Sequence, residues 1–323
     1  MIFRSITKLV LLSWVAATHA ASVDGDATPL PEGVQGYSLT GKALVSPPPD
    51  RAALEKLNMA RIEYEKDPAN ADNIIWYGRR MAYTGDYRRA IRIFSEGIDR
   101  HPRDARMYRH RGHRYISVRE FDRAIEDLEY AAELIEGEEN RIEPDGMPNA
   151  MNIPVSTLHG NIWYHLGLAW YLKHDWEKAY RAFQAGFDIG GNDDNRVSTT
   201  HWRYMILRRM GRAGEAERTL DDISTDMNVI ENMVYHRLCV FYKGQLPLAE
   251  MTAEDPDNPA GAAGAYGVAN WFLYNGDVAE ARQRMEALTN TGAWDSFGYI
   301  AAEADLAMMD RAASGAASTH GTQ

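Results

Sequence analysis

Two histidines, His110 and His113, are spaced so that they could act together. They lie three residues apart in a segment that we expect to be helical, and this spacing can place two imidazoles on one metal ion. The sequence fixes no third ligand, although several histidines could come from other helices: His159, His165, His201 and His236. We expect a structural or groove-lining role for the pair, and we predict no metal site.

The other residues of chemically active type have ordinary structural explanations. Cys239 lies in the apolar stretch Leu238-Cys-Val-Phe241 and is expected to be a small core residue rather than a reactive thiol. The paired carboxylates Glu138-Glu139 and Asp193-Asp194 are expected in loops or at solvated helix ends. Three tryptophans at helical spacing are expected to pack rather than to form a sugar platform: Trp163, Trp170 and Trp176.

The familiar enzymatic motifs are absent from this sequence. It contains no G-x-S-x-G, no phosphate-binding loop and no G-x-G-x-x-G after a strand. Asp255-Pro-Asp-Asn258 offers oxygen ligands but lacks the twelve-residue calcium loop with its closing glutamate, so a turn is expected there. We therefore predict no catalytic residue and no cofactor.

Composition excludes several broad classes of protein. The 323 residues include 35 Lys and Arg against 46 Asp and Glu, a formal net charge of −11, and 45% are hydrophobic. A hydrophobic share near the globular norm excludes a largely disordered chain, and the acidic balance argues against a general nucleic-acid binder. The single cysteine excludes an intramolecular disulfide and any site built from several cysteines.

Residues 1–20 have the pattern of a secretory signal peptide. Arg4 and Lys8 precede a run of nine apolar residues, and small residues stand before Ala21 at the expected cleavage point. Nine apolar residues are too few to span a bilayer, and no later stretch is long enough to do so. We expect an exported protein, periplasmic or secreted, whose mature chain has a formal charge of −13.

Residues 21–50 are expected to form a linker without a packed element. The segment contains five prolines and four glycines and shows no helical period. Asp50 can then cap a helix whose apolar positions recur from Ala53 to Tyr64. We expect the folded region to cover residues 51–310 and residues 311–323 to be a disordered tail.

A period of 34 residues organises the folded region. One set of five positions recurs in three copies: Gly78, Tyr87, Ala90, Phe94 and Gly97; Gly112, Phe121, Ala124, Leu128 and Ala131; Gly167, Trp176, Ala179, Phe183 and Gly186. The second copy is displaced by 34 residues and the third by a further 55, which is one period plus a 21-residue insertion at 137–157. Such a repeat predicts stacked units rather than a mixture of unrelated elements.

Each unit has the properties of a helical hairpin. A small glycine stands at the centre of the first helix, where another helix can approach closely, and a Gly-Asp turn such as Gly85-Asp86 follows. The second helix then presents an aromatic, a small and an apolar residue on one face. Because neither helix can bury that face alone, each hairpin must stack on the next.

These residues resemble the tetratricopeptide repeat (TPR) family. Trp163, Leu166 and Gly167 match its first-helix pattern, and Pro102 matches its closing proline. Glycine replaces the usual alanine at Gly97 and Gly186, and the second unit lacks the closing proline. The resemblance extends over residues 68–188 and, in weaker form, over 197–290. It implies an all-α, right-handed α-solenoid of five to six TPR-like hairpins, with a degraded unit around residues 231–242 and a capping helix around 293–309.

The resemblance also implies which residues line a concave groove. In the family, defined first-helix positions face inward, and here they include nine candidate partner-binding residues: Arg79, Tyr83, Arg106, Arg109, His113, Tyr164, Tyr171, His201 and Arg208. Arginine forks bind carboxylate or phosphate groups at two points. Alternatively, these arginines pair with second-helix glutamates of neighbouring units. The family's carboxylate clamp uses Lys and Asn where this chain has Ile75 and Arg79, so that specific activity is not expected.

Two functions remain open at this point. One is an exported non-enzymatic scaffold that binds a protein or peptide, with an acidic segment as the expected partner and neither nucleic acid nor a membrane span involved. The alternative is a solenoid-based enzyme or small-ligand receptor, with the 137–157 insertion as a lid over the groove. A closed cavity lined by His and Arg would favour the alternative.

Overall fold

The computed structural model describes residues 30–251 and 255–320, and for residues 315–320 it describes the backbone alone. The expected signal peptide, residues 1–20, lies outside the described residues. In chain order the elements are β1 Val34–Tyr37, β2 Ala43–Val45, α1 Arg51–Lys66, α2 Ala71–Tyr83, α3 Tyr87–Arg100, α4 Ala105–Ser117, α5 Phe121–Leu134, α6 Leu158–Leu172, α7 Trp176–Asp188, α8 Asp193–Arg209, α9 Ala213–Thr219, α10 Met233–Tyr242, α11 Leu248–Met251, α12 Pro259–Tyr274, α13 Val278–Thr289 and α14 Phe297–His320.

Short polar side chains determine where the helices begin. Asp50 caps α1 as expected, because its carboxylate accepts the backbone N–H of Ala53. Asn70 caps α2 in the same way, and Asp86 caps α3 directly after Gly85, whose φ of 82° allows the tight turn between these two helices. The Gly-Asp turn read from the sequence is therefore the turn of the hairpin.

The repeated glycines allow close packing within each hairpin. A Cβ atom on Gly78 would lie 2.5 Å from the Phe94 ring, and one on Gly112 would lie 2.8 Å from Leu128 Cγ. Gly167 has the same relation to Phe183, at 2.7 Å. Because these distances exclude any larger side chain without movement of a core residue, the 34-residue pattern records contacts between a first and a second helix.

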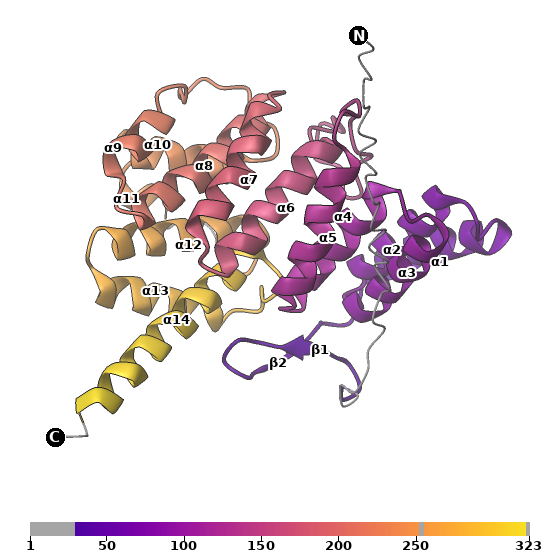
Figure 1. Ribbon diagram of the computed structural model, residues 1–323, viewed down its shortest axis with the longest axis horizontal. Coiled ribbons are helices and arrows are strands. Elements are labelled where there is room, and N and C mark those ends of the chain that lie inside the picture. The colour runs from indigo at the N-terminus through magenta and orange to yellow at the C-terminus, as the bar shows by residue number, and fades with distance from the viewer. Residues whose placement is uncertain (1–29, 252–254, 321–323) are drawn as a thin grey trace, which may run out of the picture. The chain divides into compact units, whose positions relative to one another are not determined.

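The helices form an all-α solenoid of antiparallel pairs, as predicted (Figure 1). Consecutive helices from α1 to α9 pack on one another, α10 packs on α8, and α12 packs on α8 and α10. Residues 30–251 and 255–320 contain six such pairs, from α2–α3 to α12–α13, preceded by α1 and followed by α14. The degraded unit is the pair α10–α11, in which α11 has only four residues.

The predicted linker contains a packed β-hairpin, so that part of the interpretation of residues 21–50 is wrong. Strands β1 and β2 pair in antiparallel fashion, and Leu44 is buried. Arg88 holds the hairpin against α3, because its Nε donates to the Gln35 carbonyl at 2.7 Å. The strands have only four and three residues, and the prolines that flank them made the segment resemble a linker.

The C-terminal helix also differs from the prediction. A cap was expected near residues 293–309 and a disordered tail from 311, but α14 runs without interruption from Phe297 to His320. Alanine is frequent at its C-terminal end and favours helix, which explains the continuation. Residues 321–323 lie outside the described part of the chain.

Buried charges fasten α14 to the inner side of the solenoid. The helix packs on α12 and α13 and reaches α6. Asp305, which is fully buried, accepts two hydrogen bonds from the guanidinium of Arg209, both at 2.9 Å. At the start of the helix, the Phe297 ring lies against His113 and Tyr164. The second half of the expected groove is therefore filled by protein. None of the helices described here is long and apolar enough to cross a membrane.

Candidate functional site

A pocket of about 190 Å³ lies where the first helices of the first two repeats meet the 137–157 insertion. Helices α2 and α4 form one side of it, and the insertion forms the other. Six of the lining side chains carry its chemistry: Arg79, Tyr83, Arg109, His113, Arg114 and Glu143. We call this the arginine pocket.

The insertion enters the pocket as an extended segment. Its two ends pair with each other, because Ile142 forms an antiparallel bridge with Thr157 and the Glu143 N–H donates to the Ser156 carbonyl at 3.0 Å. The path directs the Glu143 side chain into the pocket, where it is only 7% exposed. The insertion thus covers the first part of the expected groove.

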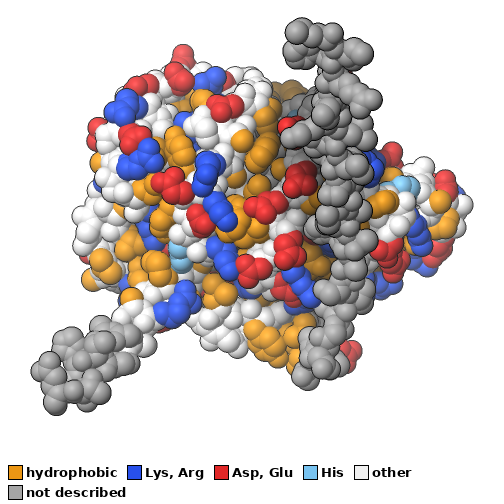
Figure 2. All heavy atoms as spheres, in the orientation of Figure 1, with side chains coloured by type: hydrophobic (Ala, Val, Ile, Leu, Met, Phe, Trp, Pro, Cys, Tyr) orange, Lys and Arg blue, Asp and Glu red, His pale blue; other side chains and the backbone are white. Residues whose placement is uncertain are grey.

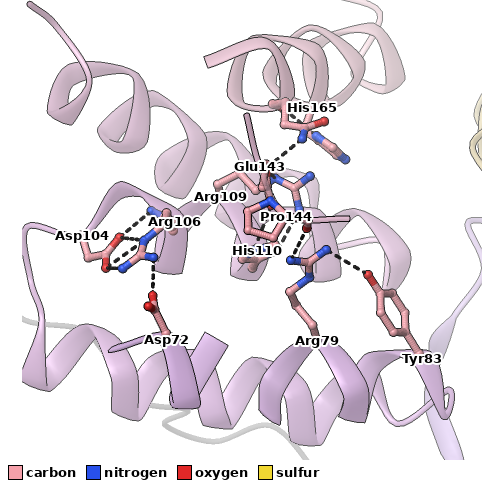
Figure 3. Close-up of polar contacts among 11 residues, drawn as sticks. Asp72, Arg79, Tyr83, Asp104, Arg106, Arg109, His110, Glu143, Pro144 and His165 are labelled. Atoms are coloured by element: carbon pink, nitrogen blue, oxygen red, sulfur yellow. Dashed lines mark hydrogen bonds and ion pairs between the residues drawn. The ribbon is translucent and has the colours of Figure 1, made fainter. Parts of the chain in front are cut away.

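Glu143 is held by three side chains from two helices (Figure 3). Its Oε2 lies 3.3 Å from Arg109 Nε and accepts a hydrogen bond from Asn161 Nδ2 at 2.8 Å, and its Oε1 lies 3.1 Å from His110 Nε2. Burial alone would raise the pKa of Glu143, but Arg109 and His110 outweigh it and hold the pKa well below its usual range. The chain therefore supplies a charged carboxylate to its own basic groove.

His110 is neutral, and its tautomer follows from its neighbours. Arg109 Nη1 lies 2.7 Å from His110 Nδ1, and a guanidinium can only donate, so Nδ1 accepts and the ring proton lies on Nε2, which faces Glu143. Burial, reinforced by Arg109, lowers the pKa of His110 to about 3. Burial together with Arg114 also holds the pKa of His113 well below 6.5. The histidines therefore add polarity to the pocket but no positive charge.

Two arginines of α2 contact the backbone of the insertion. Arg79 Nη1 donates to the Pro144 carbonyl, and Arg80 Nη1 donates to the Gly146 carbonyl, each at 2.8 Å. Arg79 also stacks on Trp76, with its guanidinium carbon 4.4 Å from the ring centre. These contacts hold residues 144–146 along α2, and Figure 3 shows the contact between Arg79 and Pro144.

The pocket contains more buried positive charge than its buried carboxylate can balance. Three arginines of the lining, Arg79, Arg109 and Arg114, are each at most 9% exposed, whereas Glu143 is the one buried acidic residue among the lining residues. Within the described residues, the Arg114 side chain has no hydrogen bond or ion pair; its guanidinium lies over the Tyr87 ring at 5.3 Å. The Nε atoms of Arg79 and Arg109 also lack hydrogen-bond partners there. Acids at the rim, Asp145 and Glu231, are half-buried and exposed respectively. The site can therefore accept a further anionic group.

The nine predicted groove residues do not form one continuous stripe. Arg79, Tyr83, Arg109 and His113 meet in the arginine pocket. Arg106 lies outside its lining and pairs with Asp72 and Asp104. The remaining four have partners elsewhere in the solenoid: Tyr164 with Tyr235 and Trp202, Tyr171 with Tyr266 and Asn270, His201 with Tyr242, and Arg208 with Tyr204 and Asn275. The reason is that α10, α12 and α14 pack against the inner face of α6 and α8.

The acidic partners of the groove arginines are not second-helix glutamates. Arg109 pairs with Glu143 of the insertion, and Arg106 pairs with Asp72 of α2 and with Asp104, the N-cap of α4. The alternative interpretation, in which these arginines join second helices of neighbouring units, therefore does not describe Arg106 or Arg109.

Other chemically active residues form no reaction site. Among the residues that the structure describes, no group of three or more His, Cys, Asp and Glu could hold a metal ion. Cys239 is fully buried with Sγ near the Val197 carbonyl, and burial raises the pKa of its thiol. A buried thiol of raised pKa is a poor nucleophile.

Three residues of the site escaped sequence reasoning: Arg80, Arg114 and Glu143. Arg80 and Arg114 each directly follow a predicted groove residue, so a wider inward face would have included them. Glu143 is an acidic residue directly before a proline in the insertion, but only the path of the insertion brings it to Arg109. On the face that Figure 2 shows, acidic and basic side chains are intermixed.

Comparison with known proteins adds only distant structural likenesses. No protein-family model matches the chain, and no curated protein matches it. Among solved structures, the TPR protein YrrB, described as having an unusual peptide-binding site, is 14% identical with a TM-score of 0.40, over 72% of this chain and 91% of that one. A putative kinesin light chain with TPR-like repeats from Podospora anserina is 13% identical with a TM-score of 0.40, over 68% and 94%. Similarity at this level carries no argument about function, and the solenoid architecture rests on the helix pairs themselves.

Proposed function

We propose that this chain is an exported, non-enzymatic scaffold of TPR-like architecture that binds an acidic segment of a protein partner at the arginine pocket. The observation that carries the proposal is the charge of the pocket, in which three buried guanidiniums face one buried carboxylate. Arg114 in particular has a charge but no acceptor within the described residues. A carboxylate of a partner would supply that acceptor with charge-assisted hydrogen bonds.

Binding to an array of eight-residue peptides that differ only in their number of glutamates tests this proposal. Binding should increase with glutamate content and weaken with added salt. Arg114→Gln should weaken binding about 30-fold or more, because loss of a buried charge-assisted contact costs about 2 kcal/mol at least. Arg208→Gln is the matched control, since Arg208 is a half-buried arginine outside the pocket that hydrogen-bonds Tyr204 and Asn275.

Three results would count against the proposal. Equal binding of glutamate and glutamine peptides would exclude charge recognition. Equal loss with Arg208→Gln would mean that the effect is general rather than local to the pocket. An unchanged affinity in a folded Arg114→Gln protein would move the binding surface elsewhere.

Export is tested separately from binding. The proposal places the mature protein in the periplasm or outside the cell, with Ala21 as its first residue. N-terminal sequencing of protein from the envelope or the medium checks this point, and a chain that still begins at Met1 would contradict it.

A small-anion receptor is the second candidate, favoured by the volume of about 190 Å³ that remains beneath the insertion with Glu143 in place. Isothermal titration with inorganic phosphate and with small carboxylates separates the two candidates. Micromolar binding of such an anion that Arg114→Gln abolishes, together with no response to acidic peptides, would favour the receptor.

A further inference from the structure

Four consecutive residues of the insertion, Glu143-Pro-Asp-Gly146, are in contact with the arginine pocket along their length. The acidic side chain is held by Arg109, His110 and Asn161. The next carbonyl, that of Pro144, accepts from Arg79, and the carbonyl of Gly146 accepts from Arg80. Helices α2, α4 and α6 thus contact one side chain and two backbone carbonyls of this tetrapeptide.

The contacts differ in how strictly they depend on residue type. A Cβ on Gly146 would lie 2.7 Å from Arg79 Nη2 and closer still to the Tyr83 hydroxyl, so a larger residue must displace the ends of the side chains that hold the segment. Pro144 has a fixed φ compatible with an extended path. The Asp145 carboxylate instead accepts from the Met147 N–H within the segment, so the helices do not hold this side chain. The pocket therefore fits the pattern Glu-Pro-x-Gly.

The segment is held at few points. Of the 21 residues 137–157, only Glu143, Gly146 and Val155 are buried. Met147 and Met151 are 73% and 62% exposed. A region with so few buried side chains opens at a lower free-energy cost than the helices beneath it.

We propose that the arginine pocket recognises a Glu-Pro-x-Gly segment of another protein, and that residues 143–146 are an internal copy that occupies the pocket in the free chain. This inference rests on the proposed function and names its ligand. The partner segment replaces the internal copy, with its glutamate on Arg109 and its two carbonyls on Arg79 and Arg80.

The internal copy lowers the apparent affinity for a partner. A tethered segment competes with the partner at an effective concentration in the millimolar range. The apparent affinity for the partner equals the affinity of the open pocket multiplied by the fraction of molecules whose pocket is open. If the internal copy is in place in 99% of molecules, a free peptide binds about 100-fold more weakly than to an open pocket. Weakening the internal copy should therefore strengthen binding of the same sequence added in trans.

The experiment uses a fluorescent peptide with the sequence of residues 141–148, Arg-Ile-Glu-Pro-Asp-Gly-Met-Pro. Its binding is measured by anisotropy to the wild-type protein, to Glu143→Gln and to Glu139→Gln, an exposed glutamate in the same insertion that serves as the matched control. Glu143→Gln should bind the peptide at least about 10-fold more tightly than the wild type and Glu139→Gln. Peptides with Gln for Glu or Ala for Gly should bind at least about 10-fold more weakly.

A second variant guards against a folding defect in the first. Gly146→Ala places a methyl group against Tyr83 and Arg79, so it displaces the internal segment without removing a buried charge. It should give the same gain in peptide affinity. Circular dichroism and thermal unfolding establish that each variant is folded.

The outcomes separate this inference from the proposed function. Acidic peptides that bind in any order of residues would support the scaffold but overturn the Glu-Pro-x-Gly pattern. No gain in either opened variant would show the insertion to be a fixed wall and overturn the inference. No binding of any acidic peptide to any variant would overturn both. Concentration-dependent dimers of the wild type that Gly146→Ala abolishes would identify a second copy, not another protein, as the occupant and would also overturn it.

Discussion

Asp305 is one of two buried carboxylates that hold α14, and removing its charge is the sharpest test of how this helix is attached. Asp305 accepts from both terminal nitrogens of Arg209 and from the Tyr266 hydroxyl at 2.9 Å, and its Oδ1 lies 3.0 Å from His174 Nε2. The Asp305 side chain is fully buried, and that of Arg209 is 8% exposed. Asp305→Asn keeps the shape but leaves the guanidinium buried without an anion.

The expected cost is about 3–5 kcal/mol, the range found when one partner of a buried pair is removed. For a chain of this size that lowers the melting temperature by about 10 °C. The double variant Arg209→Met with Asp305→Leu should recover most of the loss, because replacing both charges by apolar groups removes the need for solvation. Urea unfolding followed by circular dichroism measures both free energies of unfolding.

The same carboxylate should make stability fall in acid. Burial would raise the pKa of Asp305, but Arg209 and His174 outweigh burial and lower it from 3.8 to about 2. The folded state therefore binds this proton less readily than the unfolded chain. The contribution of about 2 kcal/mol is complete above pH 4 and is lost as the pH falls towards 2. A cost below about 1 kcal/mol for Asp305→Asn, or no rescue by the double variant, would refute this account of how α14 is held.

Two further predictions concern the core. Ala124 is fully buried with its carbonyl near Gly112, so Ala124→Leu should lower the free energy of unfolding by about 1–3 kcal/mol, as measured by thermal unfolding. Glu138→Leu, on the exposed insertion, should cost under about 0.5 kcal/mol. Equal melting temperatures for the two variants would mean that the repeat register is wrong. Burial lowers the pKa of His201 to about 3, so the unfolded chain binds this proton more readily, and the contribution of His201 to stability should fall by about 1 kcal/mol per pH unit as the pH falls from 6.5 towards 3. His201→Gln should therefore reduce the slope of stability against pH in urea titrations at several pH values, and an unchanged slope would place the titration elsewhere.

The repeat architecture was predictable because its contacts recur in the sequence. The contact of Gly78 with Phe94 spans the same number of residues as the contact of Gly112 with Leu128, so the same helix–helix contact recurs along the sequence. The β-hairpin offered no such redundancy. Its strands have four and three residues, and the contact that holds it, from Arg88 to the Gln35 carbonyl, joins segments 53 residues apart.

The candidate site was predictable only in part, because some of its residues are placed by local helical geometry and others by contacts between segments distant in the sequence. First-helix positions follow from helical geometry, so Arg79 and Arg109 could be placed on one inward face. The inner face that buries Tyr171 and His201 depends on the way α10, α12 and α14 pack against α6 and α8, which no local pattern specifies. The position of Glu143 depends on the path of a non-helical insertion, and a sequence shows its composition but not its path.

The contacts between the β-hairpin and the C-terminal region change how this solenoid should assemble. Glu303 of α14 accepts from the Leu39 N–H and forms a buried ion pair with Arg119, and the Trp294 indole donates to the Val45 carbonyl. These contacts join residues separated by 184 to 264 positions, whereas an ordinary repeat array has only neighbour contacts. The first-made part of the chain therefore cannot complete its structure until the last helix is present. Loss of that helix should weaken the β-hairpin as well as the final repeat, and unfolding should be more cooperative than in an array with neighbour contacts alone.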